Sequence, residues 1–289
     1  MTLIGRGAHL SAIRDHGLMV RTPEGEFHVQ VGATDETGSV GPVDAVLFCV
    51  KSYDTDAAAA LLPPLLADDT PVMSLQNGID NEDRIAAVIG RDHVPGGAAF
   101  LFAAIAEPGV ITAGGPRRIV FGELDGKRRT RTERLLAALV GAGIAAEITH
   151  DVGVALWSKY AFLCAQAGAT ATIRLPIGEI RESPAAWELF RGIVEEVWRV
   201  GRAVGADLPG DLIERHLAFA ASLEPTTYSS LHTDLVTGHR MELAALHGTV
   251  LRLAREHGID TPWTRAVHAI LEPWARRNES TAEAEAARA

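Results

Sequence analysis

Short apolar runs alternate with polar turns and helical patterns through the first half of the chain. The runs Ala45–Val50 and Pro71–Leu75 are continuous and β-prone, which is typical of strands buried on both faces. Each run is followed by a polar turn and a helical pattern, and the second pattern predicts a helix over Asn81–Ile89. A shorter strand is predicted over Met1–Ile4, with a helix from Ala8. This order of elements indicates a mostly parallel sheet in an α/β protein.

The remainder of the first half predicts further helices and an antiparallel closure of the sheet. An Ala/Leu-rich pattern predicts a helix that continues through Leu66. The apolar run Val94–Leu101 is followed by Gly109–Ala113 and Arg118–Phe121, two segments separated by Gly-Gly-Pro. These two segments are expected to pair with each other as antiparallel strands. A helix is also expected over Thr132–Val140.

Strand signals disappear after Asp151, and long helical patterns take their place. Five helices are predicted there: Val152–Ala167, Pro184–Val204, Leu208–Ser222, Leu235–Gly258 and Pro262–Arg276. The closing segment NESTAEAEAARA has little apolar surface to bury, so a frayed helix or a tail is expected. The change in pattern predicts two domains, 1–148 and 149–289.

Composition restricts the class of protein and of partner. The chain has 289 residues, of which 47% are hydrophobic, so it can bury a large core. A formal net charge of −10 argues against nucleic acid or an anionic membrane as the main partner, while small anions remain possible ligands. No stretch approaches the roughly 20 apolar residues of a membrane span. Two cysteines, Cys49 and Cys164, are too few for a disulfide scaffold and indicate the cytoplasm.

Three segments follow predicted strands, where an open parallel sheet binds its ligands. They are Gly5–Gly7, Lys51–Ser52 and Gln76–Gly78. An arginine and a lysine at strand ends of an acidic protein indicate phosphate recognition, because a guanidinium forks onto phosphate and an ammonium acts as a compact charge. For any one of these residues alone, a solvated loop charge is the alternative.

The chain contains no usable dinucleotide fingerprint. The turn Gly5–Gly7 lacks a third glycine at the required spacing. The segment Gly141–Ala146 matches G-x-G-x-x-A, but it follows a helix and precedes a strand, which reverses the context that a phosphate-binding turn requires.

Two ionisable residues lie within apolar helical patterns of the second half. Lys159 shares a predicted helical face with Leu156 and Leu163, and burial would disfavour its charged form, as suits a general acid. A lysine with its ammonium in water is the alternative. Glu242 likewise places a charge, here a negative one, within an apolar helical pattern. Lys159 and Glu242 could therefore form a structural pair or could face one substrate.

Three histidines of the second half, His232, His239 and His247, are separated by seven and eight residues. This spacing gives weak support for a metal site, so no metal is predicted and the three are interpreted as surface or interface residues.

The sequence resembles the ketopantoate reductases (2-dehydropantoate 2-reductases) over nearly its whole length. The likeness rests on these motifs, in order: LIGRGAHLSAI, VLFCVKSYDT, SLQNGIDNED, LWSKYAF, RLPIGEI, SSLHTDLVTGHRMEL and GIDTPWTRAVHAIL. The resemblance implies an N-terminal Rossmann-like domain with a doubly wound, mostly parallel sheet. It also implies an all-α C-terminal domain like that of 6-phosphogluconate dehydrogenase.

The resemblance also implies roles for individual residues. Arg6 would bind the 2′-phosphate of NADPH, Lys51 would lie beside the cofactor, and Asn77 would lie near the nicotinamide and the substrate. Lys159 would be the general acid that protonates the carbonyl oxygen as hydride arrives at C2.

Two further residues would hold the substrate. Glu242 would bind its hydroxyl group and Ser230 its carboxylate.

The chain departs from the family pattern in two places. Family members begin with a strand and a G-x-G-x-x-G turn ahead of the segment that opens this chain, so the Rossmann-like domain is expected to be truncated at its start by a misplaced or shortened N-terminus. Asparagines of the family's substrate pocket are replaced by Leu163, Ile177 and Thr227, which predicts a less polar pocket.

The leading hypothesis is therefore NADPH-dependent reduction of 2-dehydropantoate to pantoate in pantothenate biosynthesis. The alternatives are a reductase of another 2-keto acid or an imine, and an inactive fragment or cofactor-free binding protein on the same scaffold. A homodimer is compatible with the Ala/Leu-rich helical half.

Overall fold

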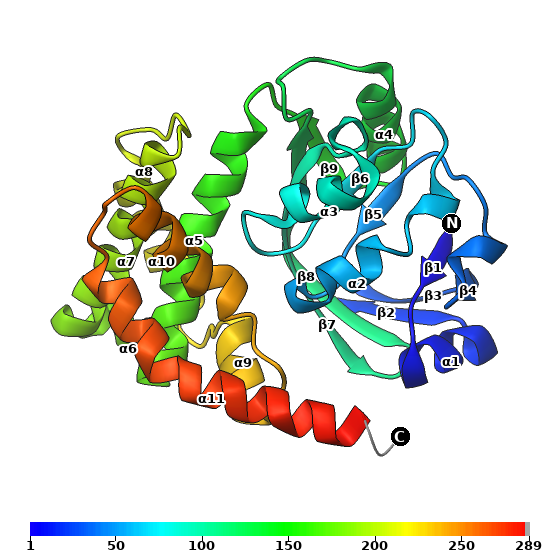
Figure 1. The fold of residues 1–289 in the computed structure, drawn as a ribbon. Helices are drawn as coiled ribbons and strands as arrows, with labels where there is room; N and C mark the ends of the chain where they lie inside the picture. Colours follow the sequence, from blue (N-terminus) through cyan, green and yellow to red (C-terminus); the bar gives the residue numbers. More distant parts are fainter. Residues whose placement is uncertain (287–289) are drawn as a thin grey trace. The chain divides into compact units, whose positions relative to one another are not determined.

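The computed structural model describes residues 1–286, which form two compact units (Figure 1). The first unit contains residues 1–50, 54–76 and 82–152. The second contains residues 51–53, 77–81 and the chain from 153 onward. The loops 51–53 and 77–81, although they follow strands of the first unit in sequence, are therefore grouped with the helices.

The first unit carries the strands and four helices. The strands are β1 (Thr2–Ile4), β2 (Leu18–Thr22), β3 (Gly25–Val29), β4 (Gly32–Thr34), β5 (Val46–Phe48), β6 (Val72–Ser74), β7 (Gly96–Glu107), β8 (Val110–Gly122) and β9 (Ala145–Ile148). The helices are α1 (Gly7–His16), α2 (Thr55–Ala59), α3 (Asn81–Ile89) and α4 (Thr130–Gly141). The strands expected at β1, β5 and β6 are thus present, as is the helix expected at α3.

Parallel pairing predominates among the described strands. The parallel pairs are β1 with β4, β2 with β8, β5 with β6, and β8 with β9, whereas β2 with β3 and β7 with β8 are antiparallel. Strand β7 follows β8 along nearly all of its length, so β2 and β9 share the other edge of β8. The predicted α/β class is confirmed.

The expected antiparallel pair Gly109–Ala113 and Arg118–Phe121 is wrong, because both segments belong to the single strand β8. Its partner β7 passes opposite both segments, with a register shift between Phe100 and Phe102. Gly115 there has φ of +79°, so the Gly-Gly-Pro sequence forms an irregularity within a continuous strand. The sequence pattern did not distinguish such an irregularity from a hairpin turn.

The helix expected to continue through Leu66 is shorter than predicted. Helix α2 ends at Ala59, and Pro63–Leu65 form a separate 3₁₀ turn. Proline lacks a backbone N–H and clashes with the preceding helical turn, so two consecutive prolines prevent one helix from continuing. The buried side chains on both sides of this break still share one apolar cluster: Phe48, Ala59, Leu62, Leu65, Val72, Ile85 and Val94.

The second unit is helical throughout its described length. Its helices are α5 (Val152–Ile173), α6 (Ile177–Glu182), α7 (Pro184–Ala203), α8 (Leu212–Ser222), α9 (Ser230–Thr237), α10 (Thr249–Glu256) and α11 (Pro262–Ala286). The predicted tail 278–289 is helical as far as Ala286, and its last three positions lie outside the described residues. No helix within residues 1–286 has the length and apolar character needed to cross a bilayer.

Helix α5 is the core of this unit. Its side chains Tyr160, Ala161, Cys164 and Ala165 are at most 1% exposed. A helix that is apolar on all sides is typically buried, and the helices around it supply the rest of the core. Lys159 therefore directly precedes a residue, Tyr160, that is withdrawn from water.

The single helix predicted over Leu235–Gly258 is wrong. Helix α9 ends at Thr237 because Gly238 adopts the left-handed conformation, with φ of 75°, and its N–H donates to the carbonyl of Asp234. The chain becomes helical again in a π-helical turn, Ala244–Gly248, which continues into α10. The break leaves Glu242 in a non-helical segment, where its carboxylate can meet a loop.

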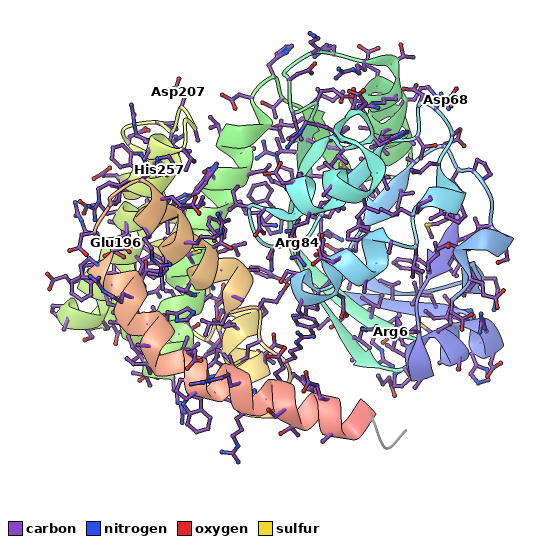
Figure 2. All side chains as sticks on the ribbon, viewed as in Figure 1. Arg6, Asp68, Arg84, Glu196, Asp207 and His257 are labelled. Atoms are coloured by element: carbon purple, nitrogen blue, oxygen red, sulfur yellow. The ribbon has the colours of Figure 1, made fainter. Side chains whose placement is uncertain are left out.

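Glu196 on α7, labelled in Figure 2, holds the first turn of α11. Its carboxylate is 1% exposed and accepts hydrogen bonds from the N–H groups of Trp263 and Thr264, each at 2.8 Å, and from the Thr264 hydroxyl at 2.7 Å. Glu196→Ala is expected to lower the free energy of unfolding by about 3 kcal/mol, because buried donors would lose a charged acceptor at a helix N-terminus. Urea unfolding measures this change. The exposed neighbour provides a control: Glu195→Ala should shift stability by less than about 0.5 kcal/mol, and equal losses in both variants would contradict the assignment.

Candidate active site

The loops Lys51–Tyr53 and Asn77–Asn81 follow β5 and β6, at the strand ends where α/β sheets usually bind ligands. Both loops belong to the same compact unit as α5 and α9. The contacts among these loops and helices are therefore internal to one unit.

Lys51 bridges two carboxylates of the helical unit. Its Nζ lies 3.2 Å from Asp234 Oδ2 and 3.3 Å from Glu242 Oε2. Burial by itself would lower the pKa of Lys51, but the two nearby carboxylates outweigh it and raise that pKa above its usual value. For Asp234, burial and the neighbouring Glu242 charge outweigh Lys51 and raise its pKa. The ion pair thus favours charge on the lysine, while burial penalises charge on Asp234.

Glu242 is held by both of its carboxylate oxygens. Oε2 accepts a hydrogen bond from the Lys51 ammonium, and Oε1 accepts one from the backbone N–H of Ser52 at 2.9 Å. The Glu242 side chain is 7% exposed, so these donors compensate a charge that is nearly withdrawn from water. A carboxylate has room for further donors, because each oxygen has two lone pairs. Glu242 can therefore also accept a hydrogen bond from a ligand hydroxyl.

A cation–π contact adds a third link between the same segments. The Arg240 guanidinium lies 4.3 Å from the centre of the Tyr53 ring and also pairs with Glu279. The residues on both sides of Ser52 are thus held by residues that come directly after α9.

Lys159 on α5 is half-buried and takes part in an interaction within the described residues. The next residue, Tyr160, is 1% exposed, and its hydroxyl donates to the carbonyls of Ala245, at 3.0 Å, and Leu246. Burial raises the pKa of Tyr160 well above its usual value, so this hydroxyl stays protonated and acts as a donor. Tyr160 thereby fixes the helix that carries Lys159 to the π-helical turn just after Glu242.

The loop that carries Asn77 lies against the same turn. A Cβ built on Gly78 would lie 3.8 Å from the Cβ of Ala245, and Gly78 has φ of +121°, which favours glycine. The backbone carbonyl of the half-buried Asn77 accepts a hydrogen bond from Asn81 Nδ2 at 3.0 Å. The side-chain amide of Asn77 takes no part in that hydrogen bond. Oδ1 of Asp80 is buried and lacks a donor among the described residues. The contacts therefore bring Lys51, Asn77, Glu242 and the Lys159 segment to one region.

Ser230 is the exposed first residue of α9. Its neighbour Ser229 caps the helix: the Ser229 Oγ accepts the His232 N–H at 3.1 Å and lies 2.6 Å from Thr170 Oγ1 on α5. A helix N-terminus favours negative charge, so Ser230 occupies a position suited to a ligand carboxylate.

Arg6 belongs to the first unit, between β1 and α1 (Figure 2). Its side chain is 79% exposed, and one guanidinium nitrogen pairs with Asp54 at 2.5 Å. The other donors of the guanidinium fork can still bind a phosphate. The local order of strand, turn and helix at Arg6 agrees with the sequence prediction.

The three positions at which the resemblance predicts asparagine in the family differ in their surroundings. Leu163 is half-buried and packs against the helical core, whereas Ile177 is fully buried. The Ile177 N–H donates to the carbonyl of Thr227 at 3.0 Å, so these two positions are adjacent. Leu163 follows Lys159 by one helical turn on α5, and its side chain is half-buried. Leu163 is therefore the one of these three positions that lies near Lys159 along the same helix.

One of the three histidines contradicts its interpretation as a surface or interface residue. His247 is fully buried in the π-helical turn, with Nε2 3.0 Å from the Cys164 carbonyl, and burial lowers its pKa to about 4. The helical periodicity of the sequence did not indicate this burial, because α9 ends at Thr237 and His247 lies in a separate π-helical turn. Within residues 1–286, no group of three or more His, Cys, Asp or Glu residues is arranged to hold a metal ion.

Sequence reasoning did not identify Asp234 or Tyr160 as site residues. Asp234 lies between Leu231 and Leu235 on α9, and both of these leucines are buried. A carboxylate beside the buried face of a short helix was an available signal, but its partner Lys51 is 183 positions away along the chain.

An α/β unit has an exposed cation after its first strand, and a helical unit holds a Glu242 carboxylate with the partly exposed Lys51. These features are typical of two-domain proteins that bind a ligand at the strand ends of an α/β sheet. The family described as "Ketopantoate reductase PanE/ApbA" matches residues 1–126, and the C-terminal part of that family matches residues 151–274. The chain belongs to the ketopantoate reductase PanE/ApbA family.

Individual relatives support this membership. The chain is 32% identical to a 2-dehydropantoate 2-reductase of Halobacterium salinarum, over 92% of this chain and 88% of the relative. A 2-dehydropantoate 2-reductase of Caulobacter vibrioides is 31% identical over 88% of this chain and 85% of its own length. The crystal structure of a PanE/ApbA family ketopantoate reductase from Ralstonia eutropha aligns with a TM-score of 0.88 at 31% identity, covering 96% of this chain and 91% of that chain.

Proposed function

We propose that this chain catalyses the NADPH-dependent reduction of 2-dehydropantoate to pantoate in pantothenate biosynthesis. Relatives of the chain are named 2-dehydropantoate 2-reductases. The observation that carries the proposal is the contact network of the helical unit. Lys51 and Ser52 hold Glu242, while Tyr160 fixes the helix of Lys159 to the turn that follows Glu242. Such an arrangement offers a proton donor and an ionised hydrogen-bond acceptor to one substrate.

Lys159 acts as the general acid in this proposal. Reduction of a keto group places negative charge on the former carbonyl oxygen, and an ammonium donor stabilises and then protonates that oxygen. Glu242 accepts a hydrogen bond from the substrate hydroxyl, and Ser230 at the N-terminus of α9 binds the substrate carboxylate. These contacts orient the keto group relative to Lys159.

One exposed cation of the described chain fits the 2′-phosphate of NADPH, whereas the sequence contains no G-x-G-x-x-G turn for its pyrophosphate. Arg6 has an exposed guanidinium between β1 and α1, which suits the 2′-phosphate. Lys51 would bind beside the cofactor, and Asn77 would lie near the nicotinamide and the substrate. Bound NADPH supplies the hydride.

A 2-keto acid with a larger apolar substituent is a second candidate substrate. Leu163 favours it, because an apolar side chain one turn from Lys159 replaces an amide that would hydrogen-bond a small polar substrate.

The cytoplasm is the proposed location of the reaction, because both cysteines, Cys49 and Cys164, are free thiols, as is usual in a reducing compartment. A homodimer stays a prediction, which sedimentation analysis tests.

The purified chain is expected to consume NADPH when 2-dehydropantoate is added, as measured by loss of NADPH absorbance and by recovery of pantoate. A parallel assay with a bulkier apolar 2-keto acid compares kcat/KM for the two substrates. A higher kcat/KM for the bulkier acid would favour the second candidate. Absence of NADPH oxidation with both substrates would contradict the proposed function.

A further inference from the structure

The Asp234 side chain forms an ion pair with Lys51 within residues 1–286. The side chain is 14% exposed, and Oδ2 lies 3.2 Å from the Lys51 Nζ. Its main-chain carbonyl has a separate task, since it accepts the N–H groups of Gly238 and His239 at the end of α9. The side chain can therefore be changed while the backbone contacts that end the helix remain.

Lys51 needs a second partner if it is to hold Glu242 in one place. Its ammonium ends a flexible four-carbon stem, and the side chain is 42% exposed. A contact between such a lysine and one carboxylate costs side-chain entropy and is weak at a partly exposed position. Asp234 restricts the same ammonium from helix α9, so Lys51 stays within reach of Glu242 Oε2, at 3.3 Å.

The charges of the cluster depend on the same arrangement. Two carboxylates that share one ammonium repel each other, and Lys51 compensates both. His239 is a further titratable group that acts on Asp234, and it lowers the pKa of that carboxyl by a smaller effect. Loss of the Asp234 charge would reduce the preference of Lys51 for its charged form, since one of two charges that raise its pKa would disappear.

We propose that Asp234 is a positioning residue that fixes Lys51 and, through Lys51, the Glu242 carboxylate that binds the substrate hydroxyl. The inference rests on the proposed function and extends it, because it gives Lys51 a task toward Glu242 in addition to its place beside the cofactor. Asp234 itself does not contact the substrate in this arrangement.

The kinetic test is Asp234→Asn, which removes the charge and keeps the shape. KM for the 2-keto acid is expected to rise about tenfold, because Glu242 loses the orientation that a charge-assisted pair provides, while the Kd for NADPH stays unchanged. Asp234→Glu restores the charge and should return KM to within about threefold of the wild-type value. Asp207→Asn, an exposed carboxylate of the same unit labelled in Figure 2, is the matched control and should leave KM unchanged.

Three results would overturn the proposal. Wild-type KM in Asp234→Asn would show that Glu242 does not depend on Asp234. An increase in the Kd for NADPH with unchanged KM would assign the Lys51–Asp234 pair to the cofactor. Equal defects in Asp234→Asn and Asp234→Glu, with a lowered melting temperature in both, would give Asp234 a merely structural role.

A second measurement does not depend on activity. The chain has only three lysines, Lys51, Lys127 and Lys159, so NMR of lysine side chains labelled with ¹⁵N resolves each one. In Asp234→Asn the Lys51 signal is expected to titrate at lower pH than in the wild type, and the Lys127 signal should not move. An unchanged Lys51 titration in an enzyme that reduces 2-keto acids would contradict the role of Asp234 alone. If Asp234→Asn shifts the Lys51 titration but the wild-type chain reduces no 2-keto acid, the proposed function is contradicted, and with it the substrate-binding part of this inference.

Discussion

Lys159→Ala is expected to lower kcat for keto-acid reduction by about 10²- to 10⁴-fold, the usual contribution of a positioned general acid. The loss should fall on kcat more than on KM, because the interaction with the developing charge on oxygen forms in the transition state. Lys159 is half-buried on α5, beside Tyr160 and Leu156, which are at most 8% exposed. Steady-state rates of NADPH oxidation over a range of substrate concentrations separate kcat from KM.

Two variants control for the loss of a positive charge. Lys159→Arg keeps the charge but should recover little activity, since a guanidinium does not release its proton in proteins. Lys127→Ala removes an exposed lysine of the first unit, with a side chain 75% exposed, and should leave the kinetics unchanged. If Lys159→Ala retained wild-type kcat, another group would have to donate the proton, and Lys159 would lose its catalytic role.

Glu242→Gln is expected to lower kcat/KM for the 2-keto acid by about a hundredfold, with KM raised. Glutamine keeps the shape of the side chain, but a neutral amide is a weaker acceptor for the substrate hydroxyl and leaves Lys51 without its second carboxylate. Glu188→Gln changes an exposed residue of α7 and should have no effect. A Glu242→Gln enzyme whose KM equals that of the wild type would remove Glu242 from substrate binding.

A double variant connects this prediction with the role of Asp234. If Asp234 acts only through Glu242, then Asp234→Asn should add little to the defect of Glu242→Gln. Multiplicative defects in the double variant would instead give the two carboxylates independent roles.

The regular elements of the first unit were predictable where an apolar run ended at an unambiguous turn. Strands β5 and β6 lie within their predicted runs, and helix α3 has its predicted bounds. Strand β8 was not predictable as one strand, because Gly-Gly-Pro is equally typical of a hairpin turn. The partner strand β7 decides between them, since it pairs with both parts of β8.

The candidate site was predictable only in part for a similar reason. Lys159 and Glu242 were identifiable because each places a charge in an apolar helical pattern, and the family resemblance added their roles. The break between α9 and α10 was missed, although Gly238 was a local signal for it. Asp234 was missed because its significance depends on Lys51, which a pattern along α9 does not contain.

The sequence by itself determined the α/β first half, the helical second half and the family, because apolar period, turn residues and motif order are local properties of the chain. Only the tertiary structure decided that Lys51 and Ser52 hold Glu242, that Asp234 shares the Lys51 ammonium, and that His247 is buried. These contacts join residues that are far apart in sequence, and their energies depend on distances of about 3 Å and on exclusion of water. Neither quantity exists before the chain has folded.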